Sequence, residues 1–226
     1  CCAATNFFAQ EADLGKLRND GIAALEAKDY QTAYNNFSSY LNQTNNQDSV
    51  IAFNCGLCAD KIKKSEDAVK YFDIAIQKKY NLTNAYIGKA GALKDLKKND
   101  EYVATLKAAV EAVPGDKKLV SMYATYYVNQ GILAQRAKKN DAAESALKQA
   151  LTIQPDNLNA LNAISSLYYT QGAALVQTDL DKAKTEFAEA KKYLEKLIPL
   201  LSDSNATQQK IKANANTMLN YINSLK

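Results

Sequence analysis

The stretch Lys63-Lys64-Ser65-Glu66-Asp67-Ala68 decides the fold, because its pattern of two lysines, a polar residue and then acid occurs twice more. The other copies are Lys97-Lys98-Asn99-Asp100-Glu101-Tyr102 and Lys138-Lys139-Asn140-Asp141-Ala142-Ala143. Helix macrodipoles favour cations at the end of one helix and acids at the start of the next. Ser65, Asn99 and Asn140 are expected to cap the second helix by accepting hydrogen bonds from its free amides. Each copy therefore predicts a joint between two helices.

The residues around each joint repeat in step with it, at intervals of about 34 to 41 residues. One apolar position after the joint is held by Ala33, Ala68, Tyr102, Ala143 and Ala183, and a second, four residues later, by Phe37, Phe72, Leu106, Leu147 and Phe187. Before each joint comes a small residue, where the first helix would lie close to its neighbour: Gly21, Gly56, Ala90, Gly131 and Gly172. Pro114, Pro155 and Pro199 stand where second helices should end. The chain is therefore predicted to be an array of helix pairs.

This pattern resembles the tetratricopeptide repeat (TPR), and the resemblance spans roughly Leu17 to Pro199. It implies an all-α fold, a right-handed α-α superhelix of about five helix pairs plus a C-terminal capping helix. Residues 11–226 are expected to form this single solenoid domain. The predicted repeats cover residues 17–48, 50–81, 84–115, 119–156 and 159–200, and the predicted terminal helix covers 206–225. The last two repeats exceed the usual length, which predicts extended first helices around 119–136 and 159–176.

Residues 1–10 are small and apolar, and charged residues begin at Glu11. Three interpretations of this segment are open: the tail of a secretory signal cleaved near Ala9–Gln10, a bacterial lipoprotein segment lipidated at Cys1, or a segment without a targeting role. The ending Phe8-Ala9-Gln10 resembles signal peptides of exported Bacteroidetes proteins. We therefore expect a periplasmic or outer-membrane-associated protein of a Gram-negative bacterium, in which a lipid anchor would replace a transmembrane segment. No run approaches the roughly 20 apolar residues of a membrane-spanning helix, and the sequence leaves the oligomeric state open.

The composition argues against an enzyme, a metal protein and a nucleic-acid-binding protein. The 226 residues include no histidine, so neither imidazole-assisted catalysis nor a closed zinc site has its usual ligand. Cys55 and Cys58 lie within a predicted first helix, which favours packing over a redox role and leaves a disulfide between them open. Gly88 and Gly91 lack the Lys-Ser/Thr of a phosphate loop, so no cofactor is expected. The net charge of +4 comes from lysines interspersed with acids, unlike a nucleic-acid-binding surface.

The TPR resemblance implies a non-enzymatic scaffold or adaptor that binds a partner polypeptide on its concave face. In such repeats, residues of the first helix around the small position face that groove. They correspond here to Arg18, Asn19, Phe53, Asn54, Lys61, Ile87, Lys94, Val128, Asn129 and Arg136. This mixture of apolar and basic residues fits an amphipathic or acidic peptide, but Ile22 and Gly91 depart from the carboxylate clamp of chaperone-binding members. Two alternatives remain: an outer-membrane lipoprotein that assists envelope protein assembly, and a glycan-binding surface protein, which the lack of Trp disfavours.

Overall fold

The computed structural model describes the backbone of residues 2–225 and the side chains of residues 13–225. In this part of the chain there are eleven α-helices, one short 3-10 helix and no strand. The helices form two compact units, unit 1 up to Leu119 and unit 2 from Val120 onward, and each is described by itself. Cys1 lies outside the described residues, so its lipidation remains a prediction.

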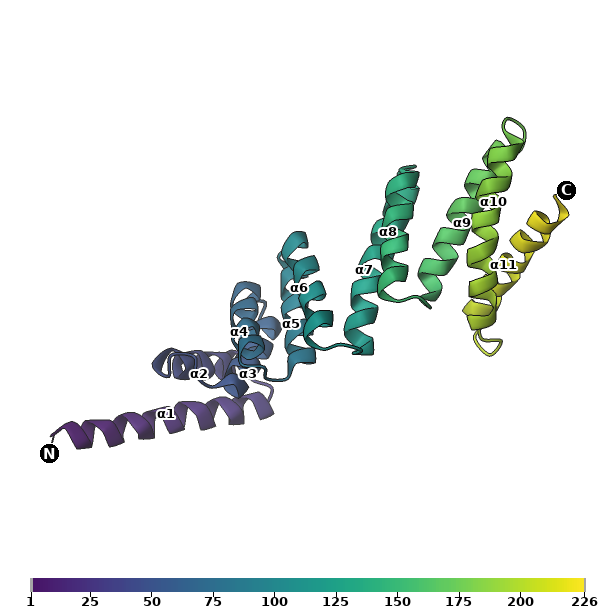
Figure 1. The fold of residues 1–226 in the computed structure, drawn as a ribbon. Coiled ribbons are helices and arrows are strands. Elements are labelled where there is room, and N and C mark those ends of the chain that lie inside the picture. Colours follow the sequence, from purple (N-terminus) through teal and green to yellow (C-terminus); the bar gives the residue numbers. More distant parts are fainter. Residues whose placement is uncertain (1, 226) are drawn as a thin grey trace. The chain divides into compact units, whose positions relative to one another are not determined.

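Unit 1 contains three successive helix pairs (Figure 1). Its helices are α1 (Cys2–Glu26), α2 (Tyr30–Gln43), α3 (Ser49–Lys61), α4 (Ser65–Gln77), α5 (Leu82–Asp95) and α6 (Asn99–Ala112). The second helices α2 and α4 each pack against the first helix of their own pair and the first helix of the next pair. The first helices α3 and α5 also contact each other directly. This is the nearest-neighbour packing expected of a helical repeat array.

Unit 2 continues the pairs and ends with an additional helix. Its elements are α7 (Lys117–Arg136), which begins before the boundary, α8 (Asn140–Ile153), α9 (Leu158–Leu175), α10 (Leu180–Leu197), η1 (Ile198–Leu200) and α11 (Ala206–Ser224). Helices α7 and α9 have 20 and 18 residues, so the predicted extension of these first helices is confirmed. Ala215 of α11 is fully buried in a cluster with Leu161, Leu194 and Leu197 of the preceding pair. Helix α11 therefore covers the last apolar face, as predicted.

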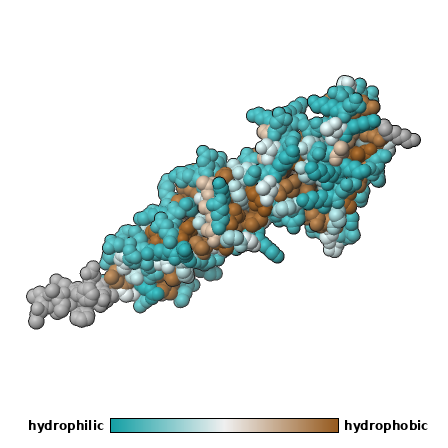
Figure 2. Space-filling view, viewed as in Figure 1, coloured by the Kyte–Doolittle hydropathy of each residue, from teal (hydrophilic) through white to brown (hydrophobic). Residues whose placement is uncertain are grey.

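The small residues before the joints lie against large side chains of the second helices. A Cβ atom added at Gly21 would lie 2.5 Å from the Phe37 ring, and one added at Gly131 would lie 2.6 Å from Leu147 Cγ. The second-helix residues at this position are almost fully buried in every pair: Phe37, Phe72, Leu106, Leu147 and Phe187. The predicted close approach of the paired helices is therefore confirmed. Figure 2 shows that hydrophilic residues cover most of the visible face, with hydrophobic residues between them.

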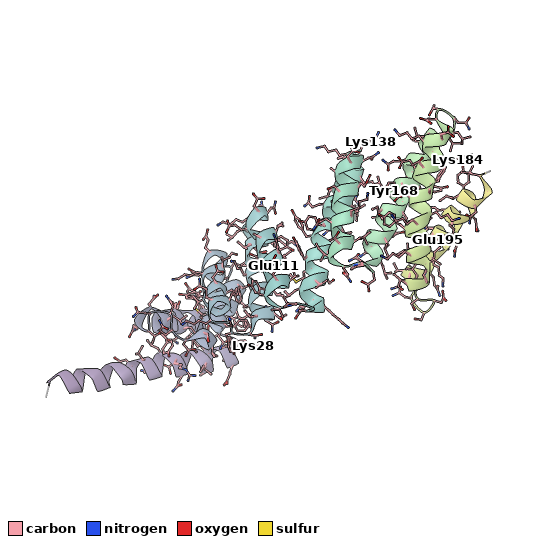
Figure 3. The ribbon with its side chains drawn as sticks, in the orientation of Figure 1. Lys28, Glu111, Lys138, Tyr168, Lys184 and Glu195 are labelled. Carbon is pink, nitrogen blue, oxygen red and sulfur yellow. The ribbon has the colours of Figure 1, made fainter. Side chains whose placement is uncertain are left out.

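The joints close the first helix through a lysine in the left-handed region. Lys63 has φ 63°, and its N–H donates to Asp60 O at 3.1 Å while the Lys64 N–H donates to Ala59 O at 2.8 Å. This double hydrogen bond is a Schellman motif, which satisfies carbonyls at the end of α3. The same closure occurs at Lys28, Lys97 and Lys138, the first and last of which are labelled at helix-pair turns in Figure 3.

The predicted capping role of Ser65, Asn99 and Asn140 is wrong. Each is the first residue of its helix, and the N-cap is the preceding lysine, which makes no side-chain cap hydrogen bond. The Schellman closure uses both lysines, so the next helix begins at once and the polar residue stands one position too late to cap it. The acids that follow do lie in the first turn, where the helix dipole favours them. The predicted positions of the prolines are confirmed, because each follows the end of a second helix.

Candidate partner-binding groove

The predicted groove residues differ in how accessible they are. Six of them are exposed: Arg18, Asn19, Lys61, Lys94, Asn129 and Arg136. Asn54 and Ile87 are half-buried. Phe53 is only 7% exposed and Val128 only 4%, because Phe53 packs against the Phe72 and Tyr80 rings and Val128 packs against Ala150 and Ala160. Val128 is therefore a core residue of unit 2.

Unit 1 contains a hollow between two first helices, which we call the α3–α5 groove. Its volume is about 560 Å³, within the range of small ligand sites. It is lined by Phe53, Leu57 and Asp60 of α3, Phe72 of α4, Asn81, and Asn84, Ile87, Gly88 and Gly91 of α5. The structure thus brings two of the predicted residues, Phe53 and Ile87, to one site. The predicted residues of α7 belong to unit 2 and take no part in this groove.

The repeat register explains why these side chains meet. Phe53 and Ile87 each stand three residues before the small position of their helix, Gly56 or Ala90. Helices α3 and α5 contact each other directly, and their equivalent positions face one hollow. Sequence reasoning missed Leu57, Asp60 and Asn84 as lining residues, although they occupy the same face by helical spacing. The signal for them was present in the register.

The hydrogen bonds and charges around the groove leave one lining carboxylate unpaired. Asn84 Nδ2 donates to Asn81 Oδ1 at 2.9 Å, which satisfies these amides at the start of α5. Near the C-terminal ends of α3 and α5, outside the groove lining, Lys63 Nζ lies 3.4 Å from Asp95 Oδ2. Asp60 has no ion-pair partner within 4.0 Å among the described residues, and it is the one charged side chain in the lining of the groove. The groove therefore combines an apolar surface with a single negative charge.

A second hollow lies in unit 2, at the starts of α9 and α11. It has a volume of about 570 Å³ and is lined mostly by polar residues, among them Asn157 and Asn205. These two side chains are already used as helix caps: Asn157 Oδ1 accepts from Ala160 N at 3.0 Å, and Asn205 Oδ1 accepts from Thr207 N at 3.0 Å. This hollow is thus more polar than the α3–α5 groove, and two of its side chains already serve as helix caps.

The two cysteines whose side chains are described are packing residues. Cys55 and Cys58 are free and fully buried among α3 and its neighbours. Burial raises the pKa of the Cys58 thiol to about 11, and burial together with the nearby Cys58 raises that of Cys55 well above its ordinary value. A reactive thiol needs a lowered pKa and access to solvent, which neither residue has.

No other chemical centre is evident in the described part of the chain. Among residues whose side chains are described, no three His, Cys, Asp or Glu gather as metal ligands. The helices described here include none with the length and apolar character needed to cross a bilayer.

The comparisons with known proteins point to one family. The crystal structure of a TPR repeats protein from Bacteroides fragilis is 39% identical in sequence, with a TM-score of 0.77, and the match covers 91% of this chain and 98% of that chain. YrrB, described as a TPR protein with an unusual peptide-binding site, is 14% identical, with a TM-score of 0.51 and coverage of 94% and 97%. The likeness to YrrB shows the fold alone. No protein-family model and no curated protein matches the sequence.

Proposed function

Because this chain belongs to the tetratricopeptide repeat family, whose fold generally serves as a non-enzymatic scaffold for protein–protein interaction, we propose that it binds an extended segment of a partner polypeptide on the concave face of its first helices. The observation that carries this proposal is the α3–α5 groove, an open and largely apolar hollow between two first helices. Rigid helices present their contacts in advance, so binding does not have to pay for ordering a loop.

The proposal is tested by capturing partners from an extract of the native cell envelope. The groove variant carries Asn54→Ala, Lys94→Glu and Arg136→Glu on the first helices α3, α5 and α7, three predicted residues of the first-helix face that do not line the α3–α5 groove itself. A matched control carries Asn35→Ala, Lys70→Glu and Lys107→Glu, all exposed positions on the second helices α2, α4 and α6. Both variants change side chains of similar size and alter the charge by similar amounts, so non-specific electrostatic effects should be alike.

We expect the wild type and the control to retain the same partner, and the groove variant to lose most of it at equal salt concentration. Retention of that partner by the groove variant would show that the first-helix face is not the binding surface. Equal loss in both variants would point to net charge and would also count against the proposal. Circular dichroism should confirm that all three proteins are equally helical.

We also propose that the protein acts in the periplasm or at the outer membrane of a Gram-negative bacterium. What supports this setting is the 39% identity to a protein of Bacteroides fragilis, together with the small, apolar character of residues 1–10. Mass spectrometry of the protein from its native cells tests it. A diacylglyceryl group on Cys1 would support the lipoprotein alternative, and a mature chain starting at Gln10 or Glu11 would support a cleaved signal. A native chain with neither feature, recovered from the cytoplasm, would contradict export.

A further inference from the structure

The centre of the α3–α5 groove has a rigid apolar floor. The Phe72 ring is fully buried, and it meets the Phe53 ring edge-to-face at 5.8 Å between centroids. Leu57 and Ile87 rise from α3 and α5 on the two sides of this floor, and Leu57 is 36% exposed. An apolar side chain that entered here would leave water and contact aromatic and aliphatic carbon, which is favourable. We call this part of the groove the socket, defined by Phe53, Leu57, Phe72, Ile87 and Gly91.

Two glycines of α5 shape the socket: Gly88 lets the Phe72 ring lie against the helix, and Gly91 leaves the space beside it open. Gly88 lies so close to the Phe72 ring that an added Cβ would overlap it, whereas a Cβ added at Gly91 would meet nothing within 4 Å. Other first helices carry side chains at the equivalent positions. Those two residues before the small position are Asn19, Asn54, Asn129 and Thr170, and those directly after it are Ile22, Leu57, Ile132 and Ala173. Among the five pairs, α5 is therefore the helix with glycine at both positions, and the space beside Gly91 is the consequence.

Asp60 gives the socket its charge preference. It stands one helical turn after Leu57 on α3 and lines the same hollow. Elsewhere in unit 1 a comparable half-buried carboxylate is paired, since Asp73 Oδ1 lies 2.6 Å from Lys89 Nζ. Asp60 has no such partner among the described residues, and no basic side chain lines the groove. A cation brought next to Asp60 would complete an ion pair in a partly shielded position, where it is screened less than on an open surface.

We propose that the socket binds one large apolar side chain of the partner, such as Leu, Met or Phe, and that Asp60 pairs with a Lys or Arg next to it in the partner sequence. This inference rests on the proposed function and adds the chemical class of the segment that is recognised. The apolar residue supplies most of the affinity because its burial is worth far more than a partly exposed ion pair. The ion pair selects basic over acidic neighbours.

The experiment uses four small probes: N-acetyl-Leu-Lys-amide, N-acetyl-Ala-Lys-amide, N-acetyl-Leu-Glu-amide and N-acetyl-Leu-Ser-amide. Each is titrated into the whole protein labelled at Ile and Leu methyl groups, and the Leu57 and Ile87 methyl signals report the socket. We expect the Leu-Lys probe to bind about tenfold or more tightly than the Ala-Lys probe. We expect it to bind about threefold more tightly than the Leu-Glu probe, with the Leu-Ser probe between them.

Gly91→Leu is the variant that should fill the socket, and Gly15→Leu is its matched control. Both glycines are exposed helical residues at which an added Cβ meets nothing within 4 Å, but Gly15 lies on α1 and does not line the groove. Gly91→Leu should abolish the methyl shifts of the Leu-Lys probe, and Gly15→Leu should leave them unchanged. Asp60→Asn should remove the preference for Lys over Glu while keeping the preference for Leu over Ala.

The outcomes separate this inference from the function on which it rests. Equal or tighter binding of the Leu-Glu probe would overturn the charge selection and with it the proposal, and so would the lack of any shift at Leu57 and Ile87. If partner capture still depended on Asn54, Lys94 and Arg136, the proposed function would stand without the socket. If the probes bound as expected while capture ignored those three residues, the socket would stand and the proposed use of the whole face would fail.

Discussion

Two alanine substitutions three residues apart on α5 should differ in their effects on stability. Glycine in a helix interior costs about 1 kcal/mol relative to alanine, so each substitution starts with that gain. At Gly91 nothing opposes it, because an added Cβ meets no atom within 4 Å. At Gly88 the added Cβ would lie 2.5 Å from Phe72 Cε2 and 2.7 Å from Cε1, well inside van der Waals contact.

The Phe72 ring has no room to retreat from Gly88. It is fully buried, and from the other side a Cβ at Gly56 would already lie 3.0 Å from its Cδ1. Overfilling a packed core costs about 1–3 kcal/mol, which cancels or exceeds the helix gain. We therefore expect Gly91→Ala to raise the free energy of unfolding by about 1 kcal/mol, and Gly88→Ala to be about 1–3 kcal/mol less stable than Gly91→Ala.

The assay is urea unfolding followed by far-ultraviolet circular dichroism, with the slopes checked for equality because repeat arrays can lose cooperativity. Phe72→Leu is the compensating change, because it replaces the ring beside Gly88 with the smaller side chain that Leu147 supplies at the equivalent position of α8. The double variant Gly88→Ala with Phe72→Leu should recover part of the loss, which appears as a favourable coupling in a double-mutant cycle. Equal stability of Gly88→Ala and Gly91→Ala would refute the reasoning, because the Phe72 floor would then not lie against α5.

Three further predictions concern the joint at Lys63, the buried thiols and the Asp116 carboxylate. Lys63→Gly should raise the free energy of unfolding by about 0.5–1 kcal/mol, because Lys63 has φ 63° and glycine adopts this left-handed conformation without strain. Lys64→Gly should not raise it, and urea unfolding compares the two variants. Native protein treated with iodoacetamide at pH 8 should remain unlabelled at Cys55 and Cys58 by peptide mass spectrometry, because both are buried and their pKa values are raised. The hydrogen bond from Thr83 lowers the pKa of the Asp116 carboxyl in the folded protein. The ionised carboxylate therefore stabilises the folded state above about pH 4, and this stabilisation is lost as the pH falls through the folded-state pKa. Asp116→Asn should shrink the difference between the urea unfolding midpoints at pH 7 and pH 3.

The helix pairs were predictable because they depend on local spacing. Phe37 and Leu147 stand at the same sequence distance from Gly21 and Gly131, the small residues that they pack against, so helical periodicity alone predicts these contacts. The terminal helix was predictable for the same reason, since its apolar stripe needs a face to cover. The caps were not predictable, because the sequence does not show which lysine adopts the left-handed conformation that ends the first helix. Asp29 and Asp179 do cap their helices, with the amides of Thr32 and Lys182 as donors, and these acids stand where the lysine pattern is missing.

The groove was predictable only in part. The register placed Ile87 and Phe53 at equivalent positions of two first helices, and both line the α3–α5 groove, but the register could not tell that Phe53 is mostly covered by the Phe72 and Tyr80 rings. Burial at that position depends on which residues the neighbouring pair contributes, and a pattern within one repeat does not contain that information. The same limit applies to Val128, whose side chain is buried against residues that follow it in the chain.

The glycines show why the location of the site had to come from the structure. Gly56, Gly88 and Gly91 lie within helical segments. The repeat register identifies Gly56 as a small packing position, but it does not show which of Gly88 and Gly91 faces open space. In the structure Gly56 and Gly88 lie against two sides of the Phe72 ring, whereas Gly91 faces open space.

Open space alone identifies no site, because Gly15 has equally open surroundings. What distinguishes Gly91 is the combination around it: an apolar floor, the exposed Leu57 on the opposite helix, and a carboxylate at Asp60 without an ion-pair partner among the described residues. A helix that lacks a side chain at this point loses about 1 kcal/mol of intrinsic stability. A partner side chain that filled the space would gain about 1.5–3 kcal/mol through burial, which exceeds that loss, and for this reason we assign the anchor of the partner to the space beside Gly91.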